Sequence, residues 1–141
     1  MHDSSQCRFC QLANGMVRSL VVYEDDLVTC FLSKEPISEG HTLVVPKKPY
    51  LDSDELDTQT AEHIMRASML VSKALKSIYH PDGISIMQNG GAFNDVGHYH
   101  MHVFCRFTGD GFGWTFRKYN QTQFYTTAVQ QKLKEAIVTK R

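Results

Sequence analysis

Short apolar runs separated by polar turns fill the segment between residues 20 and 46. Residues 20–23 and 27–32 are two such runs, and the acidic turn 24–26 between them predicts a β-hairpin. A third run over residues 41–46 ends at Pro46, which cannot donate a hydrogen bond to a sheet ladder. The pattern therefore predicts three consecutive strands.

A helical period replaces this pattern between about residues 58 and 79. His63 lies on the polar side of the period, where we expect it to be solvated. The sequence from His80 to Gly83 ends the pattern, because Pro81 cannot continue a helix. One long amphipathic helix is predicted, with a mainly apolar face made of Ala61, Ile64, Met65, Ser68, Val71, Ser72, Leu75, Ile78 and Tyr79.

Two more strands and a second helix follow. Residues 83–88 predict a strand, residues 89–97 a loop, and residues 98 to about 106 another strand. Apolar positions 129, 133, 136 and 137 predict a C-terminal helix. The order β-β-β-α-β-β-α indicates an α+β fold with a mainly antiparallel sheet of about five strands. We expect one domain over residues 1–141, with a helical C-terminal extension from about residue 115.

Composition limits the partners of the chain. Lys and Arg together number 15, as do Asp and Glu, so we expect no long nucleic acid, although a nucleotide-sized ligand stays open. The polar N-terminus lacks the apolar run of a signal peptide, and no segment reaches the length of a membrane-spanning helix. We therefore expect a cytoplasmic protein without a membrane partner. Its four cysteines are expected as thiols or metal ligands rather than as a disulfide framework.

The most unusual pattern is the alternation of His98, His100 and His102. Side chains alternate between the two faces of a strand, so the three imidazoles share one face and Tyr99 and Met101 share the other. Adjacent imidazoles repel one another when charged and offer little apolar area, so stability does not explain the row. Two explanations of the histidine row involve no function: the spacing arose by chance, or the three histidines form a solvated surface patch.

Two chemistries suit the row. Alternating histidines can ligate zinc or iron, as histidines two apart on a strand do in catalytic zinc sites. Alternatively, the middle imidazole, His100, attacks phosphorus, while its neighbours donate protons to phosphate oxygens and to the leaving group. The nearby loop Asn89-Gly90-Gly91 could offer backbone N–H groups to a phosphate, so the second chemistry explains more of the sequence.

At these residues the chain resembles the histidine triad (HIT) family, in the bacterial type with an N-terminal Cys-X-X-Cys. The family motif is His-φ-His-φ-His-φ-φ, with φ apolar, and residues 98–104 fit every position. Residues 40–47 resemble the family's strand with a fourth histidine, here His41, and residues 22–26 with Phe31 resemble its nucleoside-pocket hairpin. Cys7-Arg8-Phe9-Cys10 and Asp110-Gly111-Phe112-Gly113 resemble its N-terminal and tail segments. A HIT-like fold is thereby implied.

The resemblance implies hydrolysis or transfer on nucleoside 5′-phosphate derivatives, such as phosphoramidates and dinucleoside polyphosphates. His100 would form a nucleotidyl-histidine intermediate, and His102 would contact phosphate oxygens. His98 and His41 would support and orient the site. No metal is required for this chemistry, and a two-fold homodimer is implied. The implied nucleotide-binding residues are Phe31, Ser33, Asn89, Gly90 and Asp95.

Two of these binding positions depart from the family pattern. Asp95 stands where many members have Ser or Thr, and its carboxylate could repel a substrate phosphate, carry a proton or cap the loop. Ser33 stands where many members have an acidic residue that binds the ribose hydroxyls. A serine hydroxyl cannot hold both of these as a carboxylate does, so ribose selectivity is open.

The metal ligands depart as well. Zinc-containing members use the Cys-X-X-Cys pair, the first triad histidine and a histidine at the position of Pro49, which cannot ligate. Cys7, Cys10 and His98 could still supply three of the four ligands of a structural zinc, and His2 could complete the set. The alternative is a buried pair of reduced cysteines. The other two cysteines, at positions 30 and 105, are expected in the core.

Three hypotheses remain at this point. The first is a HIT-type hydrolase or transferase acting on nucleoside 5′-phosphate derivatives. The second is a nucleotide-binding or regulatory HIT module with little turnover, which Asp95 and Ser33 suggest. The third, a metalloenzyme built on the alternating histidines, is least favoured because no carboxylate completes the ligand set in sequence.

Overall fold

The computed structural model of the chain describes residues 6–116 and 121–140. Contacts divide the chain into two compact units, Met1–Asp110 and Gly111–Arg141, and each is described by itself. The first unit holds the sheet, its two packed helices and all of the histidines in the described chain. The expectation of one domain over residues 1–141 stays a prediction.

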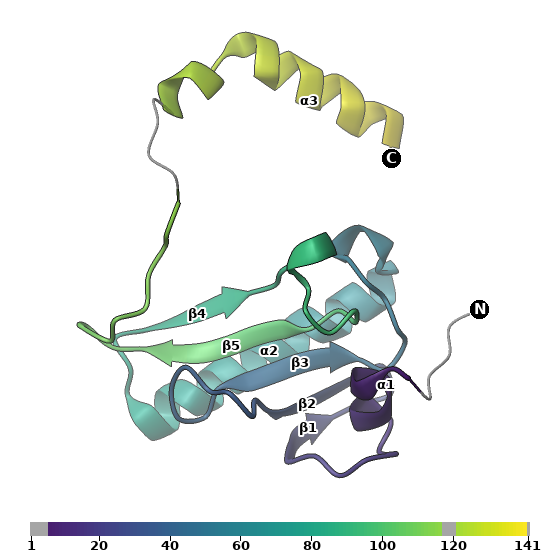
Figure 1. The fold of residues 1–141 in the computed structure, drawn as a ribbon, viewed down its shortest axis with the longest axis vertical. Helices are drawn as coiled ribbons and strands as arrows, with labels where there is room; N and C mark the ends of the chain where they lie inside the picture. The colour runs from purple at the N-terminus through teal and green to yellow at the C-terminus, as the bar shows by residue number, and fades with distance from the viewer. Residues whose placement is uncertain (1–5, 117–120, 141) are drawn as a thin grey trace. The chain divides into compact units, whose positions relative to one another are not determined.

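Five antiparallel strands form one sheet in the first unit (Figure 1). They are β1 (Val21–Glu24), β2 (Val28–Leu32), β3 (Thr42–Pro46), β4 (Gly83–Met87) and β5 (Met101–Arg106). Their spatial order is β1-β2-β3-β5-β4. The predicted α+β class and the antiparallel sheet of about five strands are thereby confirmed.

The histidine strand begins later than predicted, at Met101 instead of His98. The cause lies in the neighbouring strands, because the ladder of β3 against β5 extends only to Val44, opposite Met101. Beyond it, Pro46 has no N–H to donate, and its carbonyl oxygen lies 2.8 Å from Nε2 of His98 instead. Residues 98–100 are therefore held by side chains and loops rather than by a ladder.

The long helix α2 (Thr58–Tyr79) spans the predicted residues. Asp57 caps its N-terminus by accepting the N–H of Thr60 at 2.7 Å, and His80 ends it in the left-handed conformation with φ 47°. Figure 1 shows α2 behind the sheet. Ile64, Val71 and Leu75 pack there against the sheet core, which includes Cys30 and Cys105 as predicted. No helix of the described residues is long and apolar enough to span a membrane.

His63 on α2 is not solvated as predicted. Its Nδ1 lies 3.1 Å from Oδ2 of Asp25, and the two side chains are 21% and 19% exposed. Asp25 also accepts the N–H groups of Leu27 and Val28, which closes the β1–β2 turn. The turn therefore folds over α2 and covers a position that the helical period assigns to solvent.

A short helix, α1 (Arg8–Ala13), packs on the opposite face of the sheet. Its residues Leu12 and Ala13 form a second apolar cluster with Phe31, Leu43 and Val45. The carbonyl oxygen of Ala13 accepts the hydroxyl of Thr29 at 2.6 Å, and Asn14 donates to the carbonyl of Lys47 at 3.0 Å. These bonds fix α1 beside the histidine face of the sheet.

The described residues also form three short 3-10 helices, η1 (Ser53–Glu55), η2 (Gly91–Phe93) and η3 (Gln121–Phe124). The second unit contains η3 and α3 (Thr127–Lys140), which confirms the predicted C-terminal helix. In this unit the apolar side chains Leu133 and Ile137 of α3 are exposed.

Candidate functional site

His100 and His102 lie side by side on the sheet face opposite α2. Their ring centroids are 4.9 Å apart. Tyr99, Met101 and Val103, which alternate with them, are buried in the core against α2. The alternation expected from the sequence is therefore present, although the regular strand starts only at Met101.

His41 on the neighbouring chain segment fixes the protonation of His102. Nδ1 of His41 accepts the backbone N–H of Ile37 at 2.9 Å, so in the neutral ring the proton sits on Nε2. That Nε2 lies 2.9 Å from Nδ1 of His102 and donates to it. The remaining nitrogen of His102, Nε2, consequently carries a proton that it can donate.

Burial keeps this pair neutral. It lowers the pKa of His41 to about 4, with a smaller contribution from the charge of His102. The pKa of His102 is also lowered, first by burial and then by His100, while the carboxylate of Asp95 acts in the opposite direction. Around neutral pH both rings are therefore uncharged, and in the hydrogen bond between them His41 is the donor and His102 the acceptor.

His100 has the opposite arrangement. Its Nδ1 lies 2.9 Å from the carbonyl oxygen of His98, and because a carbonyl only accepts, Nδ1 carries the proton. The lone pair of the neutral ring is then on Nε2. The ring of Phe9 packs edge-on against His100 with a centroid distance of 5.1 Å. His100 thus offers a nucleophilic nitrogen next to a donor nitrogen of His102.

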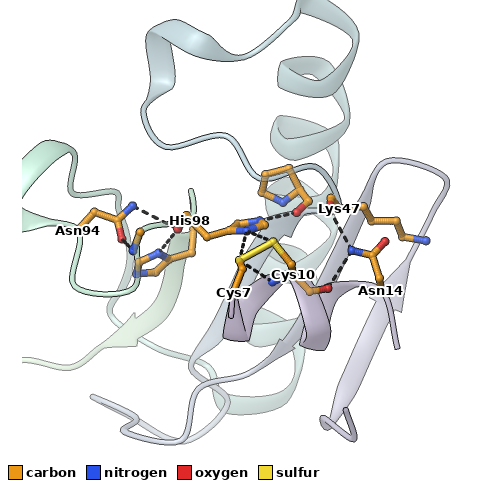
Figure 2. Close-up of a disulfide and its surroundings, with 9 residues drawn as sticks. Cys7, Cys10, Asn14, Lys47, Asn94 and His98 are labelled. Carbon is orange, nitrogen blue, oxygen red and sulfur yellow. Dashed lines mark hydrogen bonds between the residues drawn. A yellow bond between two sulfur atoms is a disulfide. The ribbon is translucent and has the colours of Figure 1, made fainter. Parts of the chain in front are cut away.

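The ring of His98 lies against α1, next to the sulfurs of Cys7 and Cys10 (Figure 2). Its Nε2 donates to the carbonyl of Pro46, so its lone pair is on Nδ1. Nδ1 lies 3.3 Å from Sγ of Cys7 and 3.3 Å from Sγ of Cys10. The two cysteines are joined by a disulfide. This disulfide differs from the thiols or metal ligands expected from the sequence. Cys7 caps α1 three residues before Cys10, which brings the two sulfurs within bonding reach.

The same three side chains could hold a metal ion. Their ligand atoms lie within 4.8 Å of one another, and all three residues are buried. The ring of His98 already has the tautomer of a metal ligand, with its second nitrogen bound to a backbone carbonyl. It is the single cluster of this kind in residues 6–116 and 121–140. His2, the fourth ligand considered from the sequence, lies outside the described residues.

Asn94 organises the loop that precedes the triad, and sequence reasoning did not single it out. Its side-chain oxygen accepts the N–H groups of Val96 and Gly97, and its Nδ2 donates to the carbonyl of His98 at 3.2 Å (Figure 2). The residue is 8% exposed. Asn often bonds the backbone two residues ahead in this way, which was the available sequence signal.

A cavity of about 650 Å³ opens on this face. Such a volume suits a nucleotide-sized ligand. Of the predicted site residues, Phe31, Ser33, Asp95, His100 and His102 line it. His41 and His98 lie behind it, in contact with His102 and His100 respectively. Phe9 and the cations Arg8, Arg18 and Lys34 also line the cavity, and sequence reasoning had not assigned them to it.

Asn89 and Gly90 are not brought to this cavity. The backbone N–H of Gly91, offered in the sequence as a phosphate donor, binds Oδ1 of Asp52 at 2.8 Å instead. A Cβ at Gly90 would lie 2.8 Å from the same oxygen. Asp52 therefore occupies the concave side of this glycine loop.

Sequence comparison relates the chain to known proteins. Residues 14–109 match the HIT domain family. Protein hit of Bacillus subtilis (strain 168) is 36% identical over 116 residues, which cover 80% of each chain. The adenosine 5′-monophosphoramidase hnt1 of Schizosaccharomyces pombe is 33% identical over 113 residues, which cover 77% of this chain and 82% of that protein.

Solved structures agree with these matches. A HIT family protein from Bacillus anthracis superposes with a TM-score of 0.84 and 30% identity, covering 96% of both chains. A zinc-bound histidine triad family protein from Mycobacterium smegmatis superposes with a TM-score of 0.72 and 28% identity, covering 95% of this chain and 99% of that one.

Proposed function

The chain belongs to the HIT domain family, and on that premise we propose that it is a nucleotidyl hydrolase or transferase acting on nucleoside 5′-phosphate derivatives. The observation that carries the proposal is the pair of opposite tautomers at the cavity. His100 offers a lone pair on Nε2, and His102 beside it offers a proton on Nε2. A nucleophile adjacent to a hydrogen-bond donor is what attack on a phosphate ester or amide requires.

His100 is the proposed nucleophile. Its Nε2 lone pair forms a bond to the α-phosphorus while the bond from phosphorus to the leaving group breaks, which gives a nucleotidyl-histidine. Water then attacks the phosphorus, the bond from phosphorus to Nε2 of His100 breaks, and the nucleoside 5′-monophosphate leaves while the proton of the water passes to solvent. The bond from His100 to the carbonyl of His98 holds the ring in the required tautomer and stabilises the cation that forms on attack.

His102 is the proposed phosphate ligand and His41 its positioning partner. A donor on Nε2 of His102 would bind a non-bridging phosphate oxygen and stabilise the charge that develops there. His41 holds that donor in place through the 2.9 Å bond to Nδ1. Because the pKa of His41 is low, its ring stays neutral and orients His102 rather than accepting a proton during the reaction.

The nucleoside is assigned to the part of the cavity around Phe31 and Ser33. Phe31 is 3% exposed and packs edge-on against Phe9, so the two rings form an apolar wall for a base. The names of relatives that act on adenylyl compounds, such as the hnt1 monophosphoramidase, make adenosine derivatives the first substrates to test.

A structural zinc is proposed at Cys7, Cys10 and His98 in the reduced protein. The disulfide leaves no thiolate for a metal, so the two states exclude each other. A zinc ion bound there would link α1 to the segment that carries the triad through coordination bonds to Cys7, Cys10 and His98. The likeness to the zinc-bound mycobacterial protein supports this assignment.

Turnover with a trapped intermediate tests the function. Adenosine 5′-phosphoramidate and diadenosine polyphosphates should yield AMP, and rapid denaturation should trap an adenylylated peptide containing residue 100. His100→Gly should abolish both, while His80→Asn, a change outside the cavity, should retain them. Turnover that survives His100→Gly contradicts the covalent mechanism.

One observation favours a second candidate function. Asp95 lines the cavity and its carboxylate acts on His102, so it lies close to the site of the substrate phosphate. A binding module with little turnover would bind AMP at this site but release no product from any of the substrates above. Restored turnover in Asp95→Ser would support this alternative. The cytoplasmic location and the two-fold homodimer stay predictions.

A further inference from the structure

The candidate cavity extends far beyond the triad. Along the sheet register, His102 of β5 lies opposite Leu43 of β3, and Leu43 lies opposite Phe31 of β2. Phe31 in turn lies opposite Val21 of β1. Three strand spacings separate the two ends of this row, which is roughly 14 Å. Arg18, which precedes β1 and lines the cavity, therefore belongs to the end remote from the histidines.

The remote end carries positive charge. Five charged side chains line the cavity. Asp95 belongs to the triad end because its carboxylate acts on His102, and Arg8 adjoins Phe9, whose ring contacts His100. The remaining three are Arg18, Lys34 and Glu35. In the described part of the chain neither Arg18 nor Lys34 forms an ion pair, so both cations are open to a ligand.

Ser33 at this end is arranged as a hydrogen-bond donor. Its backbone N–H binds the carbonyl of His41 at 2.9 Å, which fixes the residue two strands from the triad. Its Oγ accepts the N–H of Glu35 at 3.2 Å. The hydroxyl proton then points elsewhere and can be donated. A donor suits a phosphate oxygen, whereas an acidic residue here would accept bonds from free ribose hydroxyls.

Replacement of an acidic residue by a donor or a cation at the ribose also distinguishes two classes of nucleotide site in other folds. An acidic residue binds the free ribose hydroxyls of one dinucleotide, and an arginine nearby accommodates its ribose-phosphorylated counterpart. Here a serine donor and two cations line one cavity of about 650 Å³, which has room for more than a phosphate and a base.

We propose that Arg18, Ser33 and Lys34 bind a second phosphate carried on the ribose, so that the substrates are derivatives of nucleoside 2′,5′- or 3′,5′-bisphosphates. The inference rests on the proposed function, because it requires the 5′-phosphate at His100 and His102. Glu35 is the opposing charge at this subsite and reduces its affinity for the second phosphate.

Competition with four probes tests the proposal. AMP, adenosine 3′,5′-bisphosphate and adenosine 2′,5′-bisphosphate are compared as inhibitors of adenosine 5′-phosphoramidate turnover, with ADP as a probe whose second phosphate is on the 5′ chain. One bisphosphate should bind about tenfold more tightly than AMP and than ADP, as expected for a charge-assisted hydrogen bond. Which of the two it is identifies the ribose position.

Variants then locate the effect. Lys34→Gln and Ser33→Asp should bring the ratio of the inhibition constants of AMP and the bisphosphate close to one, and Glu35→Gln should increase it. Lys73→Gln on α2, outside the cavity, should leave the ratio unchanged. Equal affinity of AMP and both bisphosphates, or a preference that survives Lys34→Gln and Ser33→Asp, overturns the inference. Failure of all four probes to compete would instead contradict the proposed function.

Discussion

Nδ1 of His100 lies 2.9 Å from the carbonyl oxygen of His98. The same carbonyl accepts the side-chain amide of Asn94 at 3.2 Å. The orientation of the proposed nucleophile therefore depends on one peptide group, and a buried asparagine holds that group in place. The first prediction tests this dependence.

Asn94→Ala should lower the free energy of unfolding by about 2–3 kcal/mol. The substitution removes the side-chain acceptor of the N–H groups of Val96 and Gly97. It also removes the amide donor to the carbonyl of His98, which keeps its bond to the ring of His100. Urea unfolding measures the change. Asn89→Ala is the matched control, because Asn89 is exposed, and should stay within about 0.5 kcal/mol of the unsubstituted protein. Equal effects of the two changes would contradict a special role for Asn94.

His41→Leu should lower kcat about 10- to 100-fold, the usual cost of removing an orienting partner. His102 then loses the donor at Nδ1 that fixes its proton on Nε2. Because His102 itself is retained, AMP should still inhibit, so the loss should fall on kcat more than on KM. Steady-state kinetics with adenosine 5′-phosphoramidate separates the two, with His80→Asn as the control. A rise in KM with unchanged kcat would contradict the positioning role.

Stability in acid should depend on Asp25. Burial raises the pKa of this carboxyl, but the N–H groups of Leu27 and Val28 and the ring of His63 outweigh it, and the net shift is downward from 3.8. A carboxyl with a lowered folded pKa stabilises the protein above its unfolded pKa, and this contribution is lost as the pH falls through the folded pKa. Asp25→Asn should therefore destabilise at pH 6 and lose this effect below about pH 3.8. Urea unfolding across pH 3–7 measures the difference, and a constant difference would refute the assignment.

Local pattern predicted the elements of the fold well. The helical period from residue 58 to 79 and the apolar runs of the strands follow from side chains that must face one core. The period misplaced His63, because a turn distant in sequence covers it. The periodicity of a single strand or helix cannot predict a contact with a segment distant in sequence.

The candidate site was only partly predictable for the same reason. The alternating histidines follow from the strand geometry, but the direction of their protons depends on the carbonyl groups of Pro46 and His98 and on the N–H of Ile37. Arg18 and Lys34 enter the cavity because strand register brings them there. Asp52 binds the glycine loop although it lies 39 residues from Gly91 in the sequence, and the residues of the loop alone do not indicate this contact.

Zinc should bind to the reduced protein and stabilise it without being needed for turnover. After reduction, zinc at about 100 times its dissociation constant should add about 2.7 kcal/mol to the free energy of unfolding. The expected ligands are Cys7, Cys10 and Nδ1 of His98, so Cys10→Ser should remove this gain. Cys105→Ala, a change at a free cysteine of the core, should retain it. The measurement is thermal unfolding with and without zinc, together with turnover after chelation. Because no step of the proposed mechanism uses a metal at this cluster, turnover should persist in the chelated protein at temperatures where it stays folded. Loss of turnover from a folded, chelated protein would place the metal in the chemistry and contradict the structural assignment.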